Sequence, residues 1–204
     1  MKRREIARAV AVEHDKLVAD LRSIAPDGWD TPSLCGEWAV RDVVAHLIRI
    51  GDFYRWLPLA GWDLVRHGFR LNRALAEVAK RKGAGSSPEE LLILLERTRY
   101  ERTPVYWLHP QPLFALSEWI IHGQDIRRPL GLRATFDAEH LIAIVETAMK
   151  WYAWDSGKRK TAFRLEATDA EWSVGTGPIY RGPLEAIVMV VMGRTAAMRD
   201  LVPA

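Results

Sequence analysis

The chain has 204 residues, with 29 Lys and Arg against 26 Asp and Glu, and a formal net charge of +3. This length suits one domain of ordinary size, or one domain with a small appendage, and it allows a core without disulfides. The mixed charges, with no zinc-finger or helix-turn-helix signature, argue against nucleic-acid binding. The single cysteine, Cys35, excludes an internal disulfide and suggests a reducing compartment. Nine tryptophans indicate aromatic-rich packing or an aromatic-lined pocket.

The N-terminal sequence and the hydropathy of the chain bear on its location. The opening basic residues resemble the start of a secretion signal, but charged residues interrupt the apolar run that should follow. No window approaches the roughly 20 apolar residues that a membrane-spanning helix needs. We therefore expect a cytoplasmic protein with no membrane partner, either a monomer or a weak dimer.

The first part of the chain is predicted to be helical, because apolar residues recur there at helical spacing. An irregular loop around residues 26–32 separates the first two helices, and the glycine- and serine-rich residues 83–87 form a break. The helices are predicted at residues 2–24 and about 40–56, with partial helix over 57–82.

The next two helices have clear start or stop signals. Ser87 can cap the first, Pro88 suits its first position, and Glu90 completes a capping box, so a helix should run from there to about Tyr100. A loop containing Pro104 and Pro110 follows. The second helix should cover about residues 111–126 and end before Pro129 and Gly131.

The C-terminal part changes from helical to alternating periodicity. Asp137 caps a predicted helix that runs to about Trp154, and two short strands with a buried helix follow. The strands are predicted at 161–167 and 171–175 and the buried helix at 184–192. We therefore predict a helical domain at residues 1–155 and a small α+β domain at 156–204.

One predicted helix carries a pair of polar residues in an apolar stretch. Glu118 and His122 are four residues apart, so a helix projects both from one face, where they could bind one metal ion. His46, in another apolar helix, is the best candidate for a third ligand. Two histidines and a carboxylate suit catalytic zinc with an open position, or non-haem iron. Taken alone, however, the pattern is weak, because a histidine on an apolar face is more often a hydrogen-bonded core residue.

Two motifs carry a resemblance to a known family. The stretch TPSLCGEWAVRDVVAHLI, followed about 70 residues later by the E-x-x-x-H of SEWIIHGQDIRRPLG, resembles the mycothiol-dependent maleylpyruvate isomerases, which are DinB-like metalloenzymes. The segment FRLEATDAEWSVGTGP, with the later RGPLEAIVMVVMGR, resembles the small C-terminal domain of that family. The resemblance covers most of the chain, and residues 52–110 are its least distinctive part.

This resemblance implies a fold, a metal and a cosubstrate. The fold would be mainly α, an up-down DinB-like four-helix bundle with a small C-terminal α+β domain. The bundle would hold a divalent metal on His46, Glu118 and His122, most commonly Zn²⁺, with Ni²⁺ or Fe²⁺ as alternatives. The cosubstrate would be the low-molecular-weight thiol mycothiol. The metal would compensate for burying a carboxylate and two imidazoles inside the bundle.

Neighbouring residues acquire candidate roles, each with a structural alternative. Asp42 could accept the second imidazole N–H of His46, or simply favour the first turn of its helix. Asp125 could orient His122 in the same way, or pair with Arg128. Arg194 is the candidate catalytic residue, because it resembles a family position implicated in binding an anionic substrate; a plain cation at a helix end is the favoured structural alternative. Cys35 is interpreted as structural, because no histidine is predicted near it.

The resulting hypothesis is a metal-dependent enzyme that activates a thiol as thiolate and acts on an unsaturated or electrophilic acid. The thiolate could add, permit rotation and depart, which is cis–trans isomerisation, or remain attached, which is S-transfer. Two other classes stay open. A metal-dependent hydrolase would use the same three ligands, and a non-catalytic helical module would need them only for stability.

Overall fold

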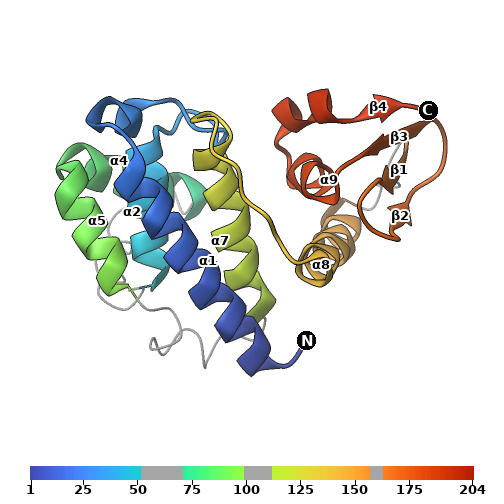
Figure 1. Ribbon diagram of the computed structural model, residues 1–204, viewed down its shortest axis with the longest axis horizontal. Coiled ribbons are helices and arrows are strands. Elements are labelled where there is room, and N and C mark those ends of the chain that lie inside the picture. The colour runs from blue at the N-terminus through green and yellow to red at the C-terminus, as the bar shows by residue number, and fades with distance from the viewer. Residues whose placement is uncertain (52–70, 99–111, 157–162) are drawn as a thin grey trace. The chain divides into compact units, whose positions relative to one another are not determined.

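The computed structural model describes residues 1–51, 71–98, 112–156 and 163–204 (Figure 1). The predicted end of the second helix at residue 56, the partial helix before residue 71 and the proline-containing loop after residue 100 lie outside these residues. The chain divides into two compact units, Met1–Arg133 and Ala134–Ala204, and each is described by itself.

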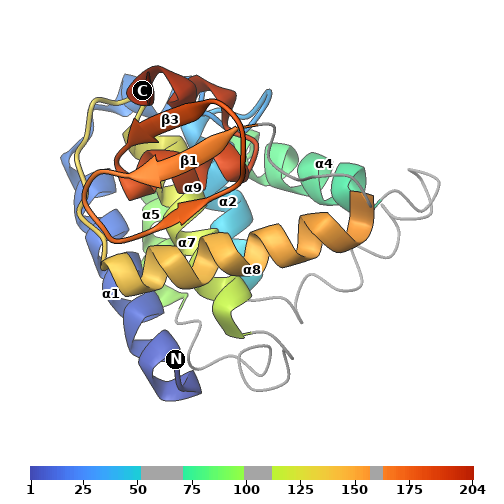
Figure 2. The same ribbon diagram turned by 90° about the vertical axis from the view of Figure 1, so that its right-hand side faces the viewer.

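The first unit is built from helices. Four of them form a closed ring of contacts, in which α1 packs on α7, α7 on α2, α2 on α5, and α5 on α1, while α4 packs on α2 (Figures 1 and 2). The elements are α1 (Arg3–Ser23), the 3-10 helix η1 (Pro26–Asp30), α2 (Val40–Gly51), α4 (Leu71–Ala84), α5 (Pro88–Arg97) and α7 (Pro112–Arg127).

Apolar faces hold this bundle together, as the helical spacing predicts. Leu17 and Leu21 of α1, Leu47 of α2 and Leu116 of α7 are fully or almost fully buried. Each buried leucine contributes roughly 1.5–3 kcal/mol relative to an exposed one. The start of α5 also follows the sequence: the Ser87 side chain accepts a hydrogen bond from the backbone N–H of Glu90, in the predicted capping box.

The second unit combines two helices with a small mixed sheet. Its strand order is β2-β1-β3-β4, with β1 and β3 parallel and the two outer pairs antiparallel. Leu165, Ala186, Ile187 and Leu201 form its buried cluster. The elements are α8 (Ala138–Ser156), β1 (Arg164–Ala167), β2 (Ser173–Val174), β3 (Ile179–Gly182), α9 (Leu184–Val191), η3 (Thr195–Asp200) and β4 (Val202–Pro203).

Two features of this unit differ from the sequence-based expectation. Strands β3 and β4 were not predicted, because β3 is a segment of only four residues between Pro178 and Pro183 that reads as a loop, and β4 has only two residues. The division at 133/134 also lies before the expected boundary at 155/156, since α8 packs on α9 within the second unit. In the described part of the chain, no helix is both long enough and apolar enough to cross a membrane.

Candidate metal centre

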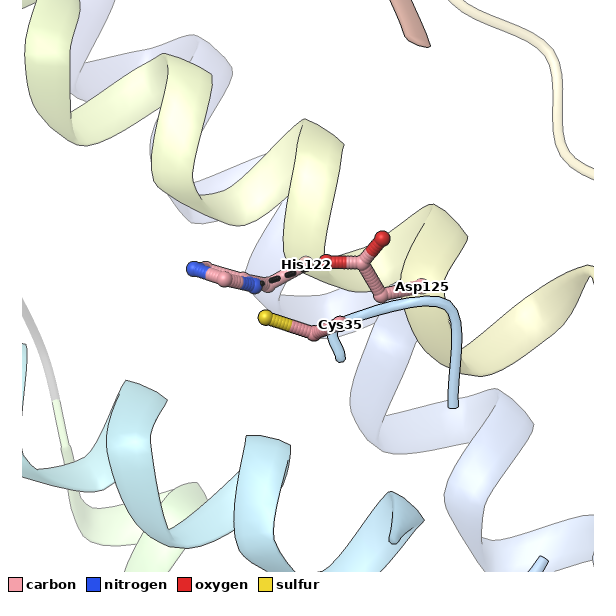
Figure 3. Close-up of side chains that lie close together, drawn as sticks. All are labelled: Cys35, His122 and Asp125. Atoms are coloured by element: carbon pink, nitrogen blue, oxygen red, sulfur yellow. Dashed lines mark hydrogen bonds and ion pairs between the residues drawn. The ribbon is translucent and has the colours of Figure 1, made fainter. Parts of the chain in front are cut away.

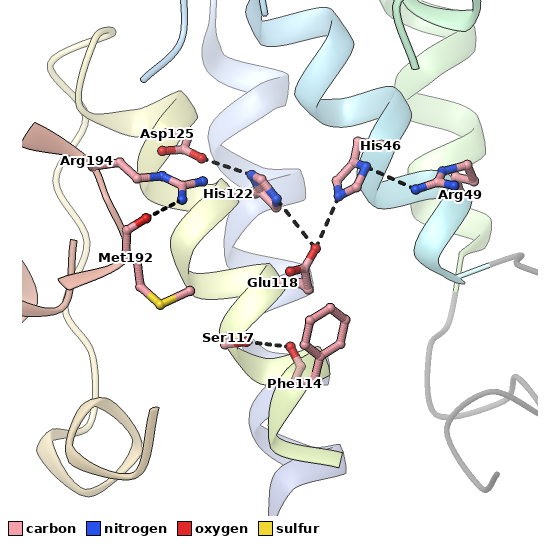
Figure 4. A network of polar contacts seen from close by, with 9 residues as sticks. All are labelled: His46, Arg49, Phe114, Ser117, Glu118, His122, Asp125, Met192 and Arg194. Atoms are coloured by element: carbon pink, nitrogen blue, oxygen red, sulfur yellow. Dashed lines mark hydrogen bonds and ion pairs between the residues drawn. The ribbon is translucent and has the colours of Figure 1, made fainter. Parts of the chain in front are cut away.

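Two contacting helices bring the three predicted ligands together. His46 lies on α2, and Glu118 and His122 lie one turn apart on α7 (Figure 4). Oε2 of Glu118 is 3.1 Å from Nε2 of His46 and 3.5 Å from Nε2 of His122. All three side chains are largely buried, and their ligand atoms lie within 4.8 Å of one another.

This spacing is compatible with a bound metal ion. Ligand atoms about 2.0–2.2 Å from a tetrahedral ion are roughly 3.3 Å from one another. The two separations, 3.1 and 3.5 Å, fall on either side of that value, and one carboxylate oxygen faces both imidazoles. The set of two nitrogens and one oxygen leaves a fourth tetrahedral position open, as a catalytic site requires.

The charges in the cluster are strongly coupled. Burial alone would raise the pKa of the Glu118 carboxyl group, but hydrogen bonds from His122 and His46 outweigh burial and lower that pKa well below its usual range. Burial would likewise lower the pKa of His122. The hydrogen bonds with Asp125, Cys35 and Glu118 overcome this effect and raise it well above its usual value. The network thus favours positive charge between two carboxylates, which is the environment that suits a bound cation.

His46 differs from His122 in its neighbours. Burial lowers the pKa of His46, and the hydrogen bond and negative charge of Glu118 oppose this only in part. Its second ring nitrogen, Nδ1, faces Nη2 of Arg49 at 3.4 Å (Figure 4). A neutral imidazole is the form that binds a metal.

The two aspartates that were predicted to orient the histidines behave differently. Oδ2 of Asp125, which is fully buried, lies 2.9 Å from Nδ1 of His122 and leaves Nε2 free to face Glu118. A carboxylate on the far nitrogen is the usual way to fix a ligating histidine. Asp42 instead accepts a hydrogen bond from the backbone N–H of Ala39. The structure does not bring Asp42 to His46, so its alternative role in the first turn of α2 is favoured.

A tight loop before α2 adds two side chains that the sequence analysis did not assign to the site. Trp38 lies with its ring centroid 5.1 Å from that of His46 and 6.3 Å from that of His122. Cys35 points toward the His122 ring beside Asp125, and the ligand atoms of these three residues lie within 4.8 Å of one another (Figure 3). The expectation that no histidine lies near Cys35 was therefore wrong. The reason is that the contact joins segments almost 90 residues apart.

Arg194, the predicted anion-binding residue, lies in the second unit. It precedes η3, and its Nη1 donates a hydrogen bond to the carbonyl oxygen of Met192. Its contact with an anionic substrate stays a prediction. Of the unassigned residues at the site, Arg49 had a signal in the sequence, since it is a charged residue three positions after His46 in the same apolar helix.

Comparisons with known proteins agree with this architecture. Two crystal structures of the mycothiol-dependent maleylpyruvate isomerase match over 100% of this chain and 93% of theirs. One is of a histidine-to-alanine mutant, with a TM-score of 0.70 and 16% identity, and the other has a TM-score of 0.64 and 15% identity. Residues 10–103 match the family described as "Mycothiol maleylpyruvate isomerase N-terminal domain". No curated relative matches the sequence.

These matches define the fold class first. The chain is a mainly α protein with a DinB-like helical bundle followed by a small α+β part, and the fold class implied by the resemblance is confirmed. The matched segment adds a likeness in sequence: residues 10–103 are similar to the N-terminal domain of the mycothiol maleylpyruvate isomerases.

Proposed function

We propose that this protein is a divalent-metal-dependent enzyme that uses a low-molecular-weight thiol, with mycothiol as the cosubstrate and an unsaturated or electrophilic acid as the substrate. The observation that carries the proposal is the convergence of His46 Nε2 and His122 Nε2 on Glu118 Oε2, at 3.1 and 3.5 Å. The names of the matched family and structures support the choice of thiol.

The residues of the site would have different roles in binding a metal ion. His46, Glu118 and His122 would be the ligands, Asp125 would keep the His122 proton on Nδ1, and the Trp38 ring would limit the access of water. When bound there, a divalent ion supplies Lewis acidity and favours the deprotonated form of a thiol. Zn²⁺ is proposed first because it prefers a tetrahedral set of nitrogen and oxygen ligands.

A thiolate beside an unsaturated acid has two outcomes. In isomerisation, a carbon–sulfur bond forms and the double bond becomes single. Rotation follows, and the carbon–sulfur bond then breaks to return the double bond and the thiol. In S-transfer, the carbon–sulfur bond persists. The carbanion formed by addition takes up the proton that the thiol released, or a leaving group such as chloride departs with its electron pair, and the sulfur stays in the product. Isomerisation consumes no thiol, whereas S-transfer consumes one equivalent of thiol for each turnover. Measuring the free thiol before and after the reaction therefore distinguishes the two.

The proposal is tested by turnover with a panel of thiols. Zn²⁺-loaded protein is assayed with maleylpyruvate and with chlorodinitrobenzene, in the presence of mycothiol, glutathione, coenzyme A or no thiol. We expect turnover only with a thiol, and the greatest rate with mycothiol. Turnover at the same rate without thiol would contradict the proposal and indicate a hydrolase. No turnover with any thiol, from protein that holds its metal, would also contradict it.

Replacing Asp125 with alanine should weaken metal binding without removing a ligand. Loss of a hydrogen-bonded carboxylate behind a ligating histidine lowers metal affinity by roughly 10- to 100-fold. We expect Asp125→Ala to show a decrease of this size in competition titrations with a chelator. Asp137→Ala, at the start of α8, is the matched control and should leave the affinity unchanged. Equal affinity in the two variants would contradict the role of Asp125.

A further inference from the structure

Arg49 is a buried cation with one buried N–H donor that has no partner among the described residues. It lies on α2, one turn after His46, between apolar residues, and is only 5% exposed. Within the described part of the chain, its Nε has no hydrogen-bond partner, and its Nη2 reaches His46 Nδ1 at the long distance of 3.4 Å. A guanidinium group has five N–H donors, and burying even one of them without an acceptor is costly. A well-packed core alone does not explain such a residue.

The contact between Arg49 and His46 depends on which ring nitrogen carries the proton. When Nε2–H of His46 donates to Glu118, Nδ1 is free to accept a hydrogen bond from Arg49. A histidine that binds a metal through Nε2 carries its proton on Nδ1 instead. Two donors would then face each other, so Arg49 would lose this acceptor when the metal binds.

The charges around the site also indicate that Arg49 needs an anionic partner when a metal is bound. Glu118 is the carboxylate that attracts Arg49 electrostatically, and Asp125 is bonded to His122. These two carboxylates would offset the two charges of a divalent ion. Among the described residues around the site, the positive charge of Arg49 would then have no counter-charge. Buried charges are normally paired, so an anionic group is the missing partner.

We propose that Arg49 binds the carboxylate of the acid substrate beside the three-residue cluster, and that metal binding frees its guanidinium group to do so. The inference rests on the proposed metal centre and deepens it by assigning the residue that selects an anionic ligand. Arginine suits this task because its planar fork can form two parallel hydrogen bonds with a carboxylate. The ligand class is a small carboxylic acid.

The experiment measures binding of succinate, an unreactive dicarboxylate, to Zn²⁺-loaded protein by calorimetry, with succinamide as the uncharged comparison. Hydrogen bonds to a charged group are worth enough to predict that Arg49→Met weakens succinate binding about tenfold or more. Arg49→Lys, which keeps the charge but not the fork, should lie between Arg49→Met and wild type. Arg41→Met is the matched control on the same helix, where Arg41 is already paired with Asp30, and it should bind succinate like wild type.

The metal content and the circular dichroism spectrum of every variant show whether a change in succinate binding comes from loss of Zn²⁺, loss of helix content or loss of the Arg49 side chain alone. We expect Arg49→Met and Arg49→Lys to retain the wild-type amount of Zn²⁺ and the wild-type helix content. Wild-type succinate affinity in a Zn²⁺-loaded Arg49 variant would overturn the assignment while leaving the metal centre intact. Loss of Zn²⁺ or of helix content in both variants would also overturn it, because Arg49 would then be a structural residue. Failure of wild-type protein to bind Zn²⁺ would overturn the proposed function itself.

Discussion

Replacing His46 or His122 with alanine should reduce bound Zn²⁺ from about one ion per chain to a small fraction of that, because two ligands rarely retain a zinc ion. Thiol-dependent turnover should fall with the metal. The metal content of protein purified in the presence of Zn²⁺, measured by elemental analysis, checks the result directly. Equal metal content in wild type and both variants would contradict the assigned ligands.

A buried histidine outside the site provides the matched control. His14 on α1 is 4% exposed, and its Nε2 lies 2.9 Å from the carbonyl oxygen of Leu95. His14→Ala removes a similar buried imidazole, so it should lower stability while leaving the metal content unchanged. Loss of metal from this variant as well would mean that the His46 and His122 results report general unfolding.

Replacing Trp119 with alanine should produce the largest loss of stability in the bundle. Trp119 on α7 is 1% exposed, and its ring meets the His14 ring edge-on, with centroids 5.1 Å apart. Removing a buried tryptophan leaves a cavity and costs roughly 3–5 kcal/mol. Urea unfolding followed by circular dichroism, in the presence of a chelator, should show this decrease without a contribution from metal.

Phenylalanine at the same position separates packing from hydrogen bonding. Among the described residues, Nε1 of Trp119 has no hydrogen-bond partner, so Trp119→Phe loses volume but no known hydrogen bond. Its destabilisation should therefore be clearly smaller than that of Trp119→Ala. Equal losses in the two variants would mean that the indole N–H, and not the ring volume, holds α1 against α7.

The helices were predictable because local signals define them. Helical spacing of apolar residues located α1 and α2, and the Ser87–Glu90 capping box placed the start of α5 at Pro88. Strand β3 could not be found in this way. Its four residues pair with β1 and β4, and such pairings depend on the tertiary fold more than on the local sequence.

In the candidate site too, contacts within one helix could be predicted from the sequence, whereas contacts between distant segments could not. The spacing of Glu118 and His122 shows by itself that they share a helix face. His46 is 72 residues away from Glu118. Its place in an apolar helix made it the best candidate for a third ligand, and the resemblance to the family strengthened that weak signal. Cys35 and Trp38 were missed because a loop folds over the end of α7, where the backbone N–H of Leu34 donates to the carbonyl oxygen of Asp125. No periodicity encodes that contact.

The most direct test of the metal centre is a crystal structure of Zn²⁺-loaded protein with anomalous data collected above and below the zinc absorption edge. We predict one strong anomalous peak about 2.0–2.2 Å from Nε2 of His46, Nε2 of His122 and a carboxylate oxygen of Glu118. A peak bound elsewhere, or none at these three side chains in protein that carries zinc in solution, would contradict the account.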